Sequence, residues 1–300
     1  MARNEMAEHI LSLSYGKDSL ACLGAIEQLG WPLDRIVHAE VWATDTIPAD
    51  LPPMVEFKAK ADKVIKERWG IEVEHVRGRY TYEQAFYRVL GGEKRPGTIY
   101  GWPIPKGPWC NSDVKMPSLD RMERGENIVY VGIAADEPAR FHNLSDTKKS
   151  PLVELGWTEA DCRQWCEEND LLSPIYTTAT RGGCWFCHNQ GVGQLRLLRK
   201  NYPELWVLML KWDKDSLVTF KPPRREWVPD PDGPETQLVY ADDDDTVELE
   251  EHGYWKNLPG CTVHDFDRRF QLEEEGLIYP DDRVFRWDML DSEMLNYRLF

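Results

Sequence analysis

The chain has 300 residues, 42% of them hydrophobic, and a formal net charge of −16. This length and apolar content are typical of one large globular domain, or of one domain with an appendage. No run of about 18 apolar residues occurs, which argues against a membrane span. The charged start of the chain, MARNEMAEH, lacks the apolar segment of an export signal, so we expect a cytoplasmic protein.

The first strong pattern along the chain is a strand, a turn and a helix. Ile10 to Leu13 alternate like a short strand, SYGKDS (14–19) forms a turn, and apolar residues then recur at helical spacing to Leu29. Such a turn points backbone N–H groups at one spot, at the positive end of the helix dipole. We therefore expect a phosphate or pyrophosphate there, and an ordinary capped turn is the plainer interpretation.

The following segments alternate between strands and helices. We expect strands over 35–42, 71–76 and 128–133, helices over 53–69, 80–90 and 111–122, and a Gly- and Pro-rich loop over 91–109. This order predicts an α/β fold: an open, mostly parallel twisted sheet with helices on both faces.

Polar residues follow two of these strands. Asp45 and Thr46 come after the second, and Gly132, Glu137 and Arg140 come at the end of the fourth. Ligands of open α/β sheets bind at the carboxyl ends of the strands, and the arginine fork suits phosphate. A strand-end cap at Asp45 and a surface Glu–Arg ion pair are the plainer interpretations.

The seven cysteines are an odd number in a chain without an export signal, which favours a reducing compartment over a disulfide framework. Cys184 and Cys187 form a CxxC flanked by glycines, as in metal sites. Cys162 and Cys166 lie four apart in a helix that Thr158 should cap, and we expect these two thiols to be buried packing residues.

The acidic charge is concentrated at the end of the chain. Residues 221–300 contain 21 Asp or Glu and 9 Lys or Arg, a net charge of −12, and the other residues carry only −4. We expect a nucleotide-binding α/β domain over 1–221 and an acidic C-terminal extension over 222–300. The extension begins with a Pro-rich stretch, and acidic helical segments should follow the run 242–245. Its expected role is an interaction surface, a lid or a partly disordered tail.

The SYGKDS turn resembles the SGGxDS loop of the adenine nucleotide alpha-hydrolases, the PP-loop ATP pyrophosphatases and their relatives, the PAPS reductases. Tyr15 stands where that loop has a glycine. The segments ATDT and GIAADEPAR resemble the family's segments after the second and fourth strands, and the likeness covers about residues 9–195. The resemblance implies catalytic roles for Lys17, Asp18, Lys115 and Arg140. It implies nucleotide binding by Ser14, Tyr15, Gly16, Ser19, Asp45, Thr46, Gly132 and Glu137.

The string WCNSDVKMP resembles the CCxxxKxxP segment of the sulfonucleotide reductases, with Trp109 in place of one cysteine. The resemblance therefore implies three metal ligands: Cys110, Cys184 and Cys187. A [4Fe–4S] cluster is our first expectation, Zn²⁺ with His188 as a fourth ligand the second, and an empty site the third.

The resemblance implies an enzyme that binds ATP, with Mg²⁺ placed by Asp18 or Asp45, and adenylylates a substrate for sulfur transfer. One alternative is reduction of PAPS or APS, although the ending YRLF lacks the family's Glu-Cys-Gly motif. Another is an inactive nucleotide-binding regulatory protein whose loop Tyr15 blocks. Expected partners are the nucleotide, an acceptor (RNA, DNA or a small molecule), a sulfur-donor protein and a second copy of the chain, but no membrane.

Overall fold

The computed structural model describes residues 7–91, 97–104, 108–120, 122, 124–177, 182–229, 238–240, 247–249 and 253–280. The chain forms two compact units, Met1–Gln190 and Gly191–Phe300. The boundary predicted after residue 221 lies inside the second unit. In the described residues, no helix is both long enough and apolar enough to cross a bilayer.

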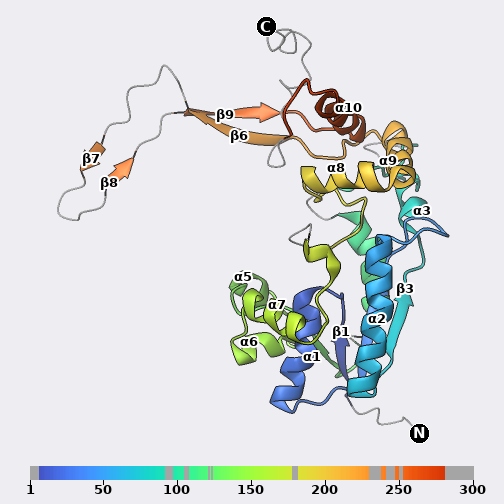
Figure 1. Ribbon diagram of the computed structural model, residues 1–300, viewed down its shortest axis with the longest axis vertical. Helices are drawn as coiled ribbons and strands as arrows, with labels where there is room; N and C mark the ends of the chain where they lie inside the picture. Colours follow the sequence, from blue (N-terminus) through green and yellow to red (C-terminus); the bar gives the residue numbers. More distant parts are fainter. Residues whose placement is uncertain are drawn as a thin grey trace. The chain divides into compact units, whose positions relative to one another are not determined.

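The first unit is built on a five-stranded parallel sheet in the order β3-β2-β1-β4-β5. Figure 1 labels two of its strands, β1 and β3. The strands are β1 (His9–Ser12), β2 (Arg35–Glu40), β3 (Val73–Arg77), β4 (Ile128–Tyr130) and β5 (Lys148–Lys149). This arrangement confirms the predicted α/β fold. The strand order reverses between β1 and β4, which is where open sheets of this kind bind ligands.

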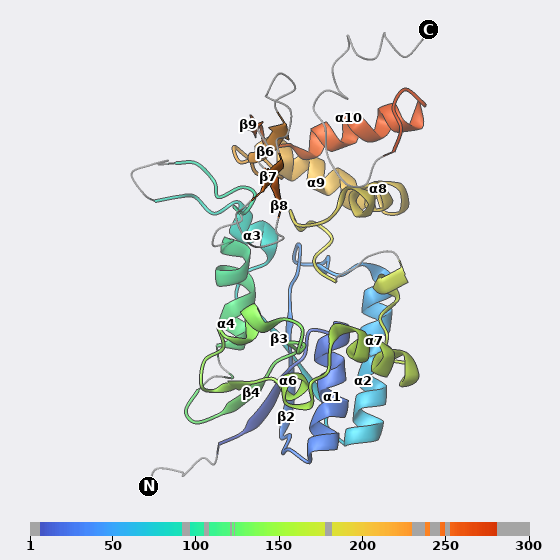
Figure 2. The same cartoon turned by 90° about the vertical axis from the view of Figure 1, so that its left-hand side faces the viewer.

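Helices cover both faces of the sheet (Figure 2). Leu11, Ile36 and Tyr130 face a core shared with α1 (Lys17–Leu29), α2 (Pro52–Trp69), α6 (Pro151–Leu155) and α7 (Glu159–Glu168). Their neighbours Ile10, Val37 and Val129 form a smaller core with Met122 and Leu119, the latter on α4 (Met116–Leu119). The two sets separate because successive side chains of a strand point to opposite faces.

Helices α1 and α7 pack unusually close. A Cβ atom on Gly24 of α1 would lie 2.3 Å from the Trp165 ring of α7, so only glycine fits there. Cys162 and Cys166 on α7 are fully buried, which confirms their predicted packing role. Thr158 caps α7 through a capping box with Asp161, also as predicted.

Two predicted helices differ from those observed. The helix expected over 80–90 is only α3 (Tyr82–Phe86), and Val89 then pairs with Ile99 in an antiparallel bridge. The helix expected over 111–122 begins as a π-helix, η1 (Cys110–Lys115), and continues as α4. Pro117 has no N–H to donate, so the α-helical ladder is broken there, and the Met116 amide instead bonds Asn111 O.

The remaining short elements of the first unit are α5 (Pro138–Phe141) and the 3₁₀ turn η2 (Pro174–Thr177). The second unit contains α8 (Val192–Asn201), α9 (Pro203–Asp215) and α10 (Val263–Glu274). Arg196 and Arg199 of α8 form ion pairs with acidic residues of α10.

The extension contains two antiparallel ribbons, whose strands β8 and β9 lie where acidic helical segments were expected. β6 (Arg224–Pro229) pairs with β9 (Gly253–Leu258), and β7 (Leu238–Tyr240) pairs with β8 (Val247–Leu249). Among the described residues of the extension, the helical prediction is correct for α10. The acidic run 242–245 lies outside the described residues.

Candidate functional site

The loop that follows β1 is closed by two serines. The amide of Ser14 donates a hydrogen bond of 3.1 Å to Ser19 Oγ, and the two hydroxyls lie 2.9 Å apart. Ser19 Oγ also donates to the carbonyl of Gly16 at 3.0 Å. Helix α1 begins at Lys17 with Gly16 as its N-cap and has no side-chain cap. The hydroxyls thus hold the turn, while the start of the helix is left to other partners.

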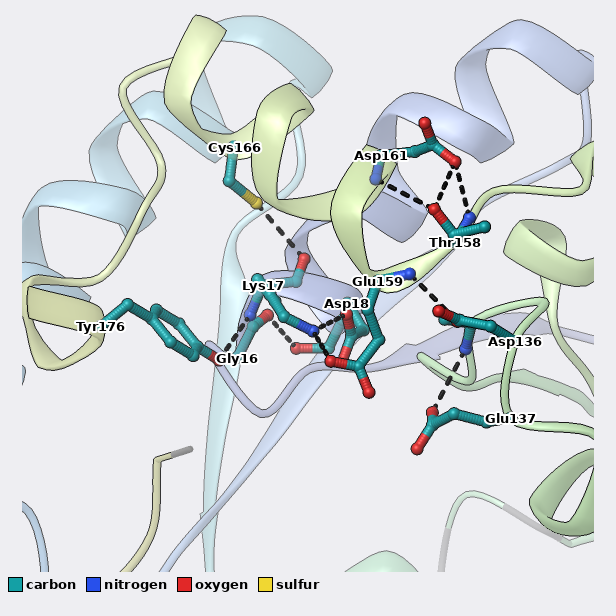
Figure 3. A network of polar contacts seen from close by, with 12 residues as sticks. Gly16, Lys17, Asp18, Asp136, Glu137, Thr158, Glu159, Asp161, Cys166 and Tyr176 are labelled. Carbon is teal, nitrogen blue, oxygen red and sulfur yellow. Dashed lines mark hydrogen bonds and ion pairs between the residues drawn. The ribbon is translucent and has the colours of Figure 1, made fainter. Parts of the chain in front are cut away.

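Lys17 joins three segments at this helix start (Figure 3). Its Nζ lies 2.7 Å from Asp18 Oδ1 and 2.8 Å from Glu159 Oε2 on α7. Its amide donates a 3.1 Å hydrogen bond to the hydroxyl of Tyr176 in η2. Burial opposes the charge on Lys17, but hydrogen bonds with the two carboxylates outweigh it and raise the lysine pKa. The ammonium group is therefore held charged at the start of α1.

Burial has the largest effect on the pKa of the neighbouring Asp18. It raises the pKa of this carboxyl group, and the hydrogen bond from Lys17 only partly offsets the effect. Glu159 and Glu137 add to the rise through their negative charges. A cation that approached these carboxylates would relieve the repulsion between them.

The loop after β4 lies against the same helix start. A Cβ atom on Gly132 would be 2.5 Å from Ser19 N and 2.8 Å from Asp18 C, so the two backbones are in direct contact. Arg140 Nη1 lies 2.7 Å from both carboxylate oxygens of Glu137. The structure therefore brings Gly132 beside the SYGKDS loop, and Glu137 acts electrostatically on Asp18.

Asp45 and Thr46 lie in a turn closed by a bridge between Trp42 and Pro48. Asp45 Oδ1 accepts a 3.1 Å hydrogen bond from Gln84 on α3, and the Thr46 amide contacts Thr44 Oγ1 at 3.3 Å. Within the described residues, the hydrogen bonds of this pair go to its own turn and to α3 rather than to Lys17.

Tyr15 contributes only its backbone to the loop. The side chain is fully buried, and its hydroxyl donates a hydrogen bond to Asp62 of α2. The ring packs edge-on against His38 of β2, with 4.8 Å between the ring centroids. The ring thus lies in the core, away from the polar contacts of Lys17.

The three predicted metal ligands come from two segments. Cys110 opens η1, and Cys184 and Cys187 lie in one tight turn, where the Cys187 amide donates to Cys184 O at 3.0 Å. Burial, and then the Cys187 thiol, raise the pKa of Cys110 to about 11. Burial, with contributions from Cys187 and Cys110, also raises the pKa of Cys184. The three thiols therefore lie close enough together to interact electrostatically.

Aromatic side chains support these thiols. Tyr82 packs against Phe186 and Trp109, with ring centroids 4.1 and 4.9 Å away, and these rings are the sequence neighbours of Cys187 and Cys110. Trp185 ties the CxxC turn to the segment after β2 through a 2.9 Å hydrogen bond from Nε1 to Pro48 O. The Lys115 charge partly opposes the rise in the Cys184 pKa, which places this lysine near the thiols.

The predicted metal site is not preformed among the described residues. Among the described residues, no group of three or more His, Cys, Asp or Glu side chains is arranged to hold a metal ion. His188, the expected fourth zinc ligand, is buried at 6% exposure.

Thiol labelling should separate these cysteines from those of the core. Cys110, Cys184 and Cys187 are partly exposed, whereas Cys22, Cys162 and Cys166 are fully buried. After reduction and chelation, we expect iodoacetamide to modify the first group before Cys22, Cys162 and Cys166 in folded protein. The reagent must reach the thiol, although the raised pKa of Cys110 and Cys184 slows their reaction. Mass spectrometry of tryptic peptides measures this, and modification of all six at equal rates would contradict the placement.

No protein-family model matches the chain, and no curated protein matches it either. The proposed function therefore rests on the geometry of the site. Sequence reasoning missed Tyr176, Glu159 and Asp136, the last of which accepts a 3.0 Å hydrogen bond from the Glu159 amide. Two of these residues lie in segments that the sequence analysis had noticed without assigning them a role. Tyr176 ends the SPIY segment, and Glu159 directly follows the Thr158 cap.

Proposed function

We propose that this chain is a nucleotide-binding enzyme of the PP-loop and PAPS reductase type. It binds ATP at the SYGKDS loop and adenylylates an acceptor for sulfur transfer. The observation that carries the proposal is the meeting of two loops, after β1 and after β4, where the strand order reverses. Lys17 and the start of α1, whose N-cap residue Gly16 has no side chain to cap it, lie at that point, where a polyphosphate would meet a cation and a helix dipole.

The charges around Lys17 favour ATP with Mg²⁺ over a free sulfonucleotide. Four carboxylates, those of Asp18, Asp136, Glu137 and Glu159, accompany only two cations, Lys17 and Arg140. A polyphosphate would add negative charge, so a divalent cation must accompany it. Mg²⁺ usually takes one or two protein carboxylates together with phosphate oxygens, so a preformed protein cage is not required. Asp18 and Glu159 fit this role, and the ion would neutralise phosphate charge.

In the proposed reaction, an acceptor oxygen attacks the α-phosphorus of ATP. The new O–P bond forms as the bond to the β-phosphate oxygen breaks, and pyrophosphate leaves with the electron pair. Lys17 and the amides at the start of α1 would stabilise the charge that develops on the leaving group. A sulfur nucleophile then forms a C–S bond, and AMP leaves. The acceptor class, whether RNA, DNA or a small molecule, and the sulfur donor stay predictions.

Release of pyrophosphate from ATP tests the proposal. We expect Mg²⁺-dependent formation of AMP and pyrophosphate in the presence of an acceptor fraction, and none with PAPS in place of ATP. Production of sulfite from PAPS and a thiol reductant would favour the reductase alternative. Tight binding of ATP without turnover on any acceptor would favour the regulatory alternative. Failure to bind any of these nucleotides would contradict the proposal.

We also propose that Cys110, Cys184 and Cys187 handle sulfur, as ligands of a [4Fe–4S] cluster or, as a second option, of Zn²⁺. Thiolates suit both groups, and the support is the electrostatic interaction among the three thiols. Visible absorption and metal analysis of anaerobically purified protein would distinguish iron, zinc and an empty site.

A further inference from the structure

Tyr15 holds the backbone of the SYGKDS loop in a conformation that residues with a Cβ atom rarely adopt. Its φ is +57°, and in the described part of the chain Asp170 is the only other non-glycine residue with a positive φ. The left-handed region is unfavourable for such residues, so surrounding contacts must hold Tyr15 there. A glycine at this position, as in the SGGxDS loop, would need no such support.

The support comes from the phenol group. Its hydroxyl donates a hydrogen bond to Asp62 Oδ1 on α2 and lies 3.2 Å from Nε2 of His75 on β3. His75 in turn contacts Asp62 Oδ2 at 3.0 Å and Glu40 Oε1 at 2.9 Å. The hydroxyl is therefore one end of a polar chain that joins α2, β3 and β2.

The ring is fixed as well as the hydroxyl. His38 meets it edge-on, and Lys58 Nζ lies 5.2 Å from its centroid. His38 Nδ1 lies 2.8 Å from the carbonyl of Leu13, which precedes the loop. A carbonyl only accepts, so Nδ1 carries the proton and donates it. Leu13, before the loop, and Tyr15, within it, are thus both held by histidines of the neighbouring strands β2 and β3.

Gly16, the N-cap of α1, follows Tyr15 directly. Any rotation of the Tyr15 backbone would re-aim the amides of Gly16 and Lys17. We infer that Tyr15 is a positioning residue: its anchored phenol sets the direction of these two amides. They donate to Ser14 Oγ and to the Tyr176 hydroxyl, and a phosphate would meet them in place of those hydroxyls. The inference rests on the proposed nucleotide site and requires no contact between the ring and the nucleotide.

Tyr15→Phe tests the anchor, because it removes the hydroxyl and keeps the ring. Tyr130→Phe is the matched control: this tyrosine is equally buried, and its hydroxyl lies 2.9 Å from His9 Nδ1, at the amino end of β1. Tyr15→Phe loses the hydrogen bond to Asp62 and the contact with His75, and Tyr130→Phe loses the contact with His9, so both should lower the midpoint of urea unfolding. Only Tyr15→Phe should weaken binding of ATP with Mg²⁺, by about tenfold in a calorimetric titration.

Amide hydrogen exchange of the nucleotide-free protein provides an independent readout. The Gly16 and Lys17 amides should exchange faster in Tyr15→Phe than in the wild type. In Tyr130→Phe, their exchange rates should equal those of the wild type. Unchanged exchange in Tyr15→Phe would overturn the anchor. Faster exchange with unchanged ATP affinity would overturn its positioning role. If the wild type binds no nucleotide, the proposed function is wrong, and exchange still decides whether the phenol anchors the loop.

Discussion

Gly132→Ala should abolish nucleotide binding and destabilise the protein. The added Cβ would lie 2.5 Å from Ser19 N and 2.7 Å from Ser19 Cα, and backbone atoms cannot rotate away as a side chain can. Either the loop after β4 or the start of α1 must shift. Overpacking of this kind costs about 1–3 kcal/mol. Urea unfolding measures the loss, and calorimetry with ATP and Mg²⁺ measures the binding.

Gly91→Ala is the matched control. Its added Cβ would meet no atom within 4 Å, and its φ is not in the left-handed range. We expect this variant to keep the stability and the nucleotide affinity of the wild type. Wild-type behaviour of Gly132→Ala would show that the two loops are not in contact, and the proposed site would then be wrong.

Lys17→Met should weaken binding of ATP with Mg²⁺ by about 100-fold, because hydrogen bonds to charged groups contribute about 1.5–3 kcal/mol each. The substitution keeps the length of the side chain but removes the ammonium that lies between Asp18 and Glu159. It also leaves these carboxylates facing each other without a counter-ion, so the unfolding free energy should fall by about 1–2 kcal/mol.

Lys60→Met is the control for this prediction. Lys60 also forms an ion pair with an aspartate, Asp170, but both side chains are largely exposed, at 50% and 83%. Exposed ion pairs contribute little, so neither stability nor ATP affinity should change measurably. Equal ATP affinity of the Lys17 and Lys60 variants in titration calorimetry would show that the ammonium of Lys17 does not meet the phosphates.

The parallel sheet could be predicted from local patterns, because the strands alternate with amphipathic helices and the chain must cross over between them. The Thr158 cap and the buried thiols of α7 were also predictable, because both follow from the local sequence of one helix. The π-helix at Cys110–Lys115 was not, since the effect of Pro117 on the preceding turn depends on which hydrogen bonds replace the missing one.

The site was only half predictable. The residues of the SYGKDS loop are contiguous, so their convergence follows from one turn. Glu159 meets Lys17 across 142 positions of sequence, and Tyr176 meets it across 159. No local pattern encodes such pairings, which are set by how α7 and η2 pack on α1. The buried direction of the Tyr15 side chain has the same origin.

The ribbons of the second unit show a further limit. In residues 224–258, acidic charge dominates the composition and obscures the alternation of the paired strands. Charge reports on solvation rather than on backbone pairing, so the helical prediction for the residues of β8 and β9 was wrong.

The most direct test is a crystal structure of the protein with Mg²⁺ and a non-hydrolysable ATP analogue. We expect phosphate oxygens within hydrogen-bonding distance of Lys17 Nζ and of the amides at the start of α1, next to Gly132. A nucleotide bound elsewhere on the protein, or no bound nucleotide at saturating concentration, would contradict the proposed site.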